Sequence, residues 1–155
     1  MDLGAAPGGW MQVSRNIVGE TGFVLGVDLK NIEPFTEANV RSVVSDLTDP
    51  EIVNIIREIL PRAADAVVSD VSPNISGIWE VDHARQIDLA RKSLQIATSV
   101  LRIGGTFSVK VFQGDMLNNF VYEMRQCFGT VRFVKPKASR RKSAELYILG
   151  LKKLV

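Results

Sequence analysis

Short apolar runs alternate along the chain with longer segments in which apolar residues recur every three or four positions. The short runs have the length of β-strands, and the longer spacing is that of helices with one buried face. This alternation predicts an α/β domain built on a mostly parallel sheet. The strand-like runs are residues 22–28, 40–46, 64–70, 106–112, 131–134 and 144–151.

The segments between these runs have recognisable helix ends. One helix is expected from about residue 9 to 18, and a second from residue 50 to 60, with Asp49 as its cap and a proline on either side. A third carries apolar residues from 87 to 101 and is expected to end at the glycines 104 and 105, because glycine adopts left-handed backbone at little cost. A fourth is expected to start near residue 115 and to end by residue 129.

Only a short basic segment separates the last two strand-like runs, so we expect them to pair antiparallel. The resulting picture is a doubly wound sheet with an antiparallel hairpin at one edge. A length of 155 residues, with 46% hydrophobic and 23% charged residues, suits one compact domain over residues 1–155.

Composition narrows the class of protein further. The apolar runs are far shorter than the ~20 residues of a membrane span, and the first residues are not a basic stretch followed by an apolar one, so we expect neither a membrane span nor a secretory signal. The single cysteine, Cys127, excludes an internal disulfide and leaves no metal-binding cluster, so we expect no metal and a cytoplasmic location. A monomer is the favoured oligomeric state. A net charge of +2 is too small for whole-surface attraction to nucleic acid.

The first ten residues, MDLGAAPGGW, read as a strand, a turn of small residues and a helix start. Gly4, Gly8 and Gly9 would let backbone N–H groups approach an anionic ligand at the helix terminus. The spacing matches neither Gly-x-Gly-x-x-Gly nor a Walker loop, because Ala6 follows two residues after Gly4 and Trp10 follows Gly9. A dinucleotide or a nucleoside triphosphate is therefore a poor fit.

Two aspartates close the next two strand-like runs. Asp28 is placed to accept hydrogen bonds from the hydroxyls of a ribose, and Asp46 would lie level with an adenine. A ribose without a pyrophosphate is what S-adenosylmethionine presents, so we expect this cofactor. The alternative for either aspartate taken alone is a helix or turn cap.

Ionisable residues also stand in or after three further apolar runs. Asp70 ends VVSD, Lys110 lies within SVKVF, and Glu145 lies within AELYI. Ligands of open parallel sheets bind beyond the carboxyl ends of the strands, so these side chains are candidates for one polar cluster. Burial favours a neutral lysine and nearby carboxylates favour the ammonium, which suits a group that handles a proton. A structural ion pair, or exposure to solvent, is the alternative.

A basic segment and two aromatic residues complete the candidates. Residues 132–142 hold six basic and no acidic side chains, and would contact phosphates of a nucleic acid or form a solvated hairpin tip. Trp79 and His83 would stack on a base or anchor the loop after Asp70. The candidate residues for these phosphate contacts are Lys135, Lys137, Arg140, Arg141 and Lys142.

Taken together, DLGAAPGGW, SDVSPN, SVKVF and SRRKSAELYI closely resemble the FtsJ/RrmJ family of RNA 2′-O-ribose methyltransferases over nearly the whole chain. The resemblance implies a Rossmann-like, mostly parallel seven-stranded sheet with an antiparallel last strand. It also implies S-adenosylmethionine as cofactor, and catalysis by Asp70, Lys110 and Glu145. The cofactor-binding residues would be Gly4, Gly8, Gly9, Trp10, Asp28, Asp46 and Asp70.

The catalytic tetrad of the family has a first lysine upstream of the glycine loop, and this sequence has no counterpart for it. Neither Lys30 nor Lys92 occupies that position. A misplaced start, a truncated chain or a genuine short form would each explain the difference, and part of the RNA-binding surface would be missing with it.

The resemblance implies methyl transfer to a ribose 2′-oxygen of RNA, with a uridine of 23S ribosomal RNA, free or in the large ribosomal subunit, as the expected target. Three alternatives stay open. These are a transfer-RNA or mRNA-cap 2′-O-methyltransferase, an RNA-binding or ribosome-assembly module with weakened catalysis, and a nicotinamide oxidoreductase.

Overall fold

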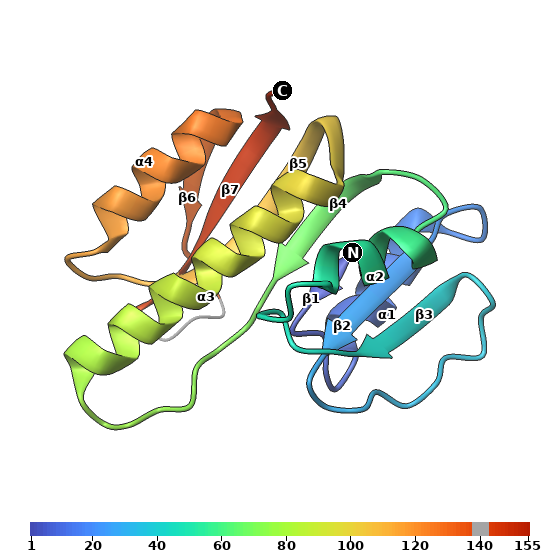
Figure 1. The fold of residues 1–155 in the computed structure, drawn as a ribbon, viewed down its shortest axis with the longest axis horizontal. Coiled ribbons are helices and arrows are strands. Elements are labelled where there is room, and N and C mark those ends of the chain that lie inside the picture. The colour runs from blue at the N-terminus through green and yellow to red at the C-terminus, as the bar shows by residue number, and fades with distance from the viewer. Residues whose placement is uncertain (138–142) are drawn as a thin grey trace.

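The computed structural model describes residues 1–137 and 143–155. In these two ranges seven strands form one sheet in the order β3-β2-β1-β4-β5-β7-β6 (Figure 1). The strands are β1 (Asp2–Leu3), β2 (Val24–Asp28), β3 (Val40–Val44), β4 (Ala64–Ser69), β5 (Leu101–Phe112), β6 (Phe128–Val134) and β7 (Glu145–Lys153). Strands β1 to β5 are parallel, and β7 runs antiparallel to both of its neighbours. The expected α/β sheet with an antiparallel edge hairpin is therefore confirmed.

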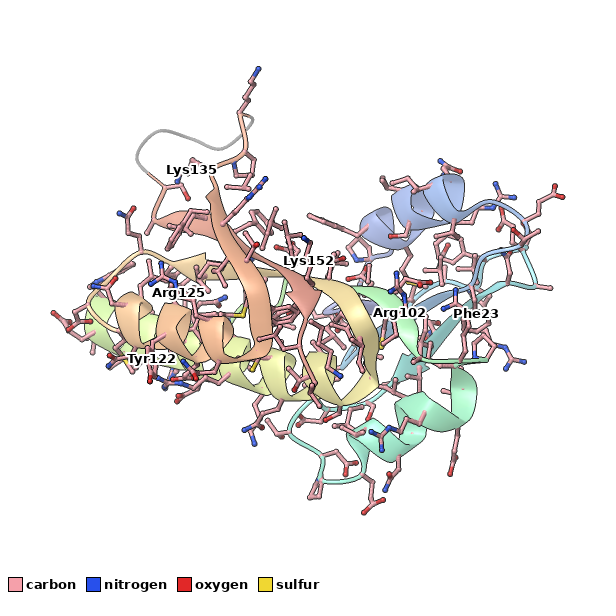
Figure 2. The ribbon with its side chains drawn as sticks, turned by 90° about the horizontal axis from the view of Figure 1, so that it is seen from above. Phe23, Arg102, Tyr122, Arg125, Lys135 and Lys152 are labelled. Atoms are coloured by element: carbon pink, nitrogen blue, oxygen red, sulfur yellow. The ribbon has the colours of Figure 1, made fainter. Side chains whose placement is uncertain are left out.

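Among the described residues four helices cover the sheet, namely α1 (Gly9–Val18), α2 (Ile52–Ile59), α3 (Trp79–Val100) and α4 (Leu117–Cys127). Figure 1 shows α3 and α4 in front of the sheet. Figure 2, turned by 90°, shows α1 on the opposite side. No helix among the described residues is both long and apolar enough to cross a membrane.

The main core lies between the sheet and α2, α3 and α4. It includes Phe107 on β5 and Phe128 on β6, whose rings stack with centroids 6.2 Å apart. A smaller cluster under α1 contains Ala5, Met11, Val24, Ile32 and Val40. Gly26 lies beneath this helix. A Cβ at this position would come within 2.3 Å of Met11 Sδ, so the close packing of α1 on β2 requires glycine here.

Two helix ends differ from the sequence-based expectation. The helix expected to reach Gly104–Gly105 ends at Val100, because Leu101 already pairs with Ala64 in the sheet. The helix expected from residue 50 begins at Ile52, and the Asp49 carboxylate instead accepts a hydrogen bond from the Glu51 N–H in the turn before it. The end of α3 is thus set by pairing in the sheet, and the start of α2 by a local hydrogen bond, and not by the glycines and the capping residue that the sequence offers.

Candidate functional site

The glycine loop lies at the carboxyl end of β1, where the strand order of the sheet reverses. Its backbone has positive φ at Gly4 (75°) and at Gly8 (121°), a conformation that other residues adopt only with strain. A Cβ on Gly4 would lie 2.7 Å from Val71 Cγ1. The loop therefore needs glycine here, and its small residues leave the N-terminus of α1 accessible.

The Asp28 carboxylate ties this loop to the end of β2. Its Oδ2 accepts a hydrogen bond from the Ala6 N–H at 2.9 Å, and its Oδ1 accepts one from the Lys30 N–H at 2.8 Å. Each carboxylate oxygen can accept a second bond, so Asp28 braces the loop and can still receive a hydroxyl of a ligand.

Asp46 follows β3 at the same edge of the sheet and is exposed. Its Oδ1 accepts hydrogen bonds from both the N–H and the hydroxyl of Thr48, each at 2.8 Å. These bonds hold the pKa of the Asp46 carboxyl below its usual range. Asp46 therefore caps a turn, which was the alternative expected from the sequence. Its other oxygen, Oδ2, accepts no hydrogen bond from the described residues.

Asp70, Lys110 and Glu145 converge at one point, as the sequence predicts. Lys110 Nζ lies 3.4 Å from Asp70 Oδ1 and 3.7 Å from Glu145 Oε1. The lysine is buried, with its side chain 8% exposed, whereas the two carboxylates are 32% and 46% exposed. The cluster therefore places the Lys110 amine between two partly solvated carboxylates at the carboxyl edge of the sheet.

Two members of this cluster were not found by sequence reasoning. Lys110 Nζ also donates a hydrogen bond to the Ser72 hydroxyl. The Tyr147 hydroxyl donates to Asp70 Oδ1 at 2.8 Å, and burial and the nearby Asp70 raise the pKa of Tyr147 far above its usual range. Tyr147 was detectable in principle, because it stands two residues after Glu145 and therefore points to the same face of its strand.

Trp10 and Tyr147 form an aromatic side of the site. Their ring centroids lie 5.9 Å apart with a 35° angle between the planes. Trp10 is 43% exposed, so one part of its ring packs on Tyr147 and the rest faces solvent beside the glycine loop.

The structure describes only part of the basic segment, and its lysines differ in their surroundings. Lys135 Nζ donates hydrogen bonds to the backbone carbonyls of Ser143 and Glu145, the latter at 2.6 Å, so its ammonium braces the hairpin next to the site. Lys137 is exposed. The remaining candidates, Arg140, Arg141 and Lys142, lie outside the described residues.

Trp79 and His83 pack against each other, with Trp79 45% exposed and His83 buried. Their rings stack 5.6 Å apart, and Trp79 also stacks on Phe112 at 6.0 Å. His83 is 1% exposed, and its Nε2 accepts a hydrogen bond from the Met116 N–H. Of the two expectations, loop anchoring describes His83, because a buried ring cannot stack on a base.

This geometry fits an adenosyl sulfonium ligand. The N–H groups of Gly4, Ala5 and Ala6 are taken up by Val27 and Asp28, so the donors for a ligand are those at the N-terminus of α1, which begins at Gly9 without side-chain bulk. Carboxylates stand at the end of β2 and after β3 and β4. A positive ligand charge would be favoured by Asp70, one of whose oxygens accepts no hydrogen bond among the described residues.

Comparison with known proteins agrees with this arrangement. The model of the FtsJ-like methyltransferase family matches residues 1–153. Two relatives named ribosomal RNA large subunit methyltransferase E are each 51% identical to this chain. The protein from Methanocaldococcus jannaschii aligns over 97% of this chain and 62% of its own length, and that from Methanothrix thermoacetophila over 99% and 59%. The chain thus spans about three-fifths of the length of these relatives.

Solved structures show the same fold. A candidate ribosomal RNA methyltransferase from Plasmodium falciparum is 25% identical and superposes with a TM-score of 0.87, covering 99% of this chain and 85% of its own. A candidate methyltransferase from Streptococcus mutans, solved with SAH, is 16% identical with a TM-score of 0.59, covering 99% and 84%. The second likeness concerns the fold alone.

Proposed function

Because this chain belongs to the FtsJ-like methyltransferase family, we propose that it transfers a methyl group from S-adenosylmethionine to a ribose 2′-oxygen of RNA. The proposed substrate is large-subunit ribosomal RNA, with a uridine as the modified nucleotide. The observation that carries the proposal is the position of Lys110 Nζ between Asp70 and Glu145 at the edge next to the glycine loop.

The cofactor-binding residues of the proposal surround that edge. The glycine loop would receive the methionyl carboxylate, Asp28 the ribose hydroxyls and Asp46 the adenine amino group. S-adenosylmethionine supplies a methyl group that its sulfonium already makes electrophilic. The residues proposed to contact it are Gly4, Gly8, Gly9, Trp10, Asp28, Asp46 and Asp70.

The protein's own contribution is to orient the ribose and to handle one proton. Lys110 Nζ orients the 2′-hydroxyl and, in its neutral form, accepts the proton that this hydroxyl loses. Asp70 holds Lys110 from one side, and Glu145 holds it from the other. Orientation of the reactants and general-base assistance are the two effects that this cluster supplies.

The RNA strand is proposed to reach the site over the hairpin between β6 and β7. Lys137 and the three basic residues at 140–142 would contact phosphates, and Lys135 would keep the hairpin fixed next to Glu145. The cytoplasmic location, the single domain over residues 1–155 and the monomeric state expected from the sequence remain part of this proposal.

The test is a transfer assay with radiolabelled S-adenosylmethionine and ribosomal RNA, transfer RNA or capped mRNA as acceptor. Lys110→Met keeps the aliphatic stem and should lower the transfer rate by about 10²–10⁴-fold, because it removes the proton acceptor. Lys92→Met, an exposed lysine on α3, is the matched control and should leave the rate unchanged.

Cofactor affinity separates the possible outcomes. Lys110→Met should bind S-adenosylmethionine as the wild type does, since the lysine orients the ribose. An equal loss of cofactor binding and transfer would show instead that Lys110 is a structural residue. RNA binding by the wild type without any transfer would favour the RNA-binding module.

A further inference from the structure

Helix α3 presents a buried amide to the segments that carry the candidate catalytic residues. Gln86 is 0% exposed, and its Nε2 donates hydrogen bonds to the backbone carbonyls of Val71, at 3.1 Å, and Lys110, at 2.8 Å. Val71 directly follows Asp70. One side-chain amide therefore links the backbone next to Asp70 with the backbone of Lys110 itself.

The position of this link in the sheet is informative. The pairing of β4 with β5 ends at Ser69 and Val109, one residue before Asp70 and Lys110. From that point the ladder no longer fixes the separation of the two segments. The Gln86 amide donates to a carbonyl of each segment just past the end of the ladder. It therefore holds the two segments together at the point where backbone pairing between the strands has stopped.

We propose that Gln86 is a positioning residue for the Asp70–Lys110 pair. Its two hydrogen bonds fix the backbone of both segments, and thereby the 3.4 Å approach of Lys110 Nζ to Asp70 Oδ1. The inference rests on the proposed function, since it gives Gln86 a role in methyl transfer. Gln86 acts through Lys110 and Asp70, and it is not a catalytic residue.

Gln86 is held in the core through the two N–H groups of its amide. Its Oε1 is buried and has no hydrogen-bond partner among the described residues. A buried polar atom without a partner costs free energy, and the two hydrogen bonds that the amide donates to the carbonyls of Val71 and Lys110 offset this cost. The amide is explained by what its two N–H groups hold.

Ser93 provides a matched control on the same helix. It lies seven residues later on α3, is fully buried, and its hydroxyl forms a 2.8 Å hydrogen bond with the Ser69 hydroxyl. Ser69 is still inside the ladder, so removal of this bond should destabilise the protein without displacing Asp70 or Lys110.

The experiment compares steady-state transfer by the wild type, Gln86→Met and Ser93→Ala, with melting temperatures measured in parallel. Gln86→Met should lower kcat by about 10²-fold, since a misplacement of about 1 Å at reacting groups has this effect, while KM for S-adenosylmethionine and for RNA stays within about twofold. Ser93→Ala should keep kcat within about twofold of the wild type.

Each outcome decides between the proposals. An active wild type with an equally active Gln86→Met overturns this inference alone, as does an equal loss of kcat in Ser93→Ala. A wild type without transfer to any RNA overturns the proposed function and this inference with it. If Gln86→Met does not fold, Gln86→Asn, whose shorter amide cannot reach both carbonyls, is measured by the same criteria.

Discussion

Asp2 is a carboxyl group buried in the middle of the sheet. It is 1% exposed, and neither carboxylate oxygen has a hydrogen-bond partner among the described residues. Burial raises the pKa of Asp2 to about 7, and the nearby carboxylates of Asp70 and Asp28 contribute in the same direction. The folded protein therefore holds this proton at pH values at which the unfolded chain, with the ordinary pKa of 3.8, has released it.

The consequence is a stability that falls with rising pH. Below about pH 4 Asp2 is protonated in both states and has no effect; between pH 4 and 7 the folded state binds more protons, so its stability declines. Replacing Asp2 with Asn should remove this decline, which amounts to about 4 kcal/mol for a shift of some three pKa units. Thermal melts at pH 4 and pH 7.5 measure it, and parallel pH profiles for the two proteins would contradict it.

Individual site residues were predictable to different extents. Asp70, Lys110 and Glu145 stand out in the sequence because an apolar strand rarely accommodates an ionisable residue, and the structure brings them together. Ser72 and Tyr147 did not stand out, because serine is common in loops and tyrosine is common in strands. Only the folded backbone shows that both bind members of the cluster.

At the scale of elements, α3 organises the loop that follows Asp70. The Asp82 carboxylate, in its first turn, accepts hydrogen bonds from the N–H and hydroxyl of Ser76 and from the N–H of Gly77. These bonds hold the pKa of the Asp82 carboxyl below its usual value. Further along the helix, Arg85 donates to the Asn74 carbonyl, so several side chains of α3 fix the loop.

Replacing Asp82 with Ala should release this loop. The amides of Ser76 and Gly77 lose their acceptor, so their hydrogen exchange should become faster while exchange in β4 stays unchanged. Asp88→Ala, an exposed aspartate later on the same helix, is the control and should leave both amides protected. Unchanged exchange at Ser76 in the Asp82 variant would show that the loop is fixed by other contacts.

At the scale of the whole molecule, charge is nearly balanced, and any attraction to RNA has to be local. The net charge is +2, and the basic candidates gather on the segment between β6 and β7, beside Glu145. The opposite end of β7 carries Lys152, which is also exposed (Figure 2). Lys137 and Lys152 carry the same charge at opposite ends of one hairpin, so replacing each in turn tests which end contacts RNA.

Lys137→Ala should reduce the salt dependence of RNA binding, whereas Lys152→Ala should not. Removal of one phosphate contact lowers the slope of log K against log salt by about one, because one fewer counterion is released. Filter binding between 50 and 200 mM salt measures the slope. Equal slopes for the two variants would place the RNA elsewhere on the surface.

The sequence alone was sufficient for the α/β class, the antiparallel hairpin, the need for glycine in the first loop and three members of the polar cluster. These features depend on local patterns, namely the spacing of apolar residues, turn chemistry and charges in apolar strands. The FtsJ-like family was also readable, because four short motifs occur in order along the chain.

The tertiary structure decided where α2 and α3 end or begin, which oxygen accepts which N–H, and the roles of Gln86, Asp82 and Asp2. The end of α3 and the roles of Gln86 and Asp2 depend on residues far apart in the chain, which meet only when β1 lies between β2 and β4 and α3 packs on β4 and β5. The start of α2 and the bonds of Asp82 are local, and the folded backbone decides which nearby donor each carboxylate binds. A buried polar group is stabilised or destabilised by the partners that the fold brings to it, and those partners are not written in its sequence neighbours.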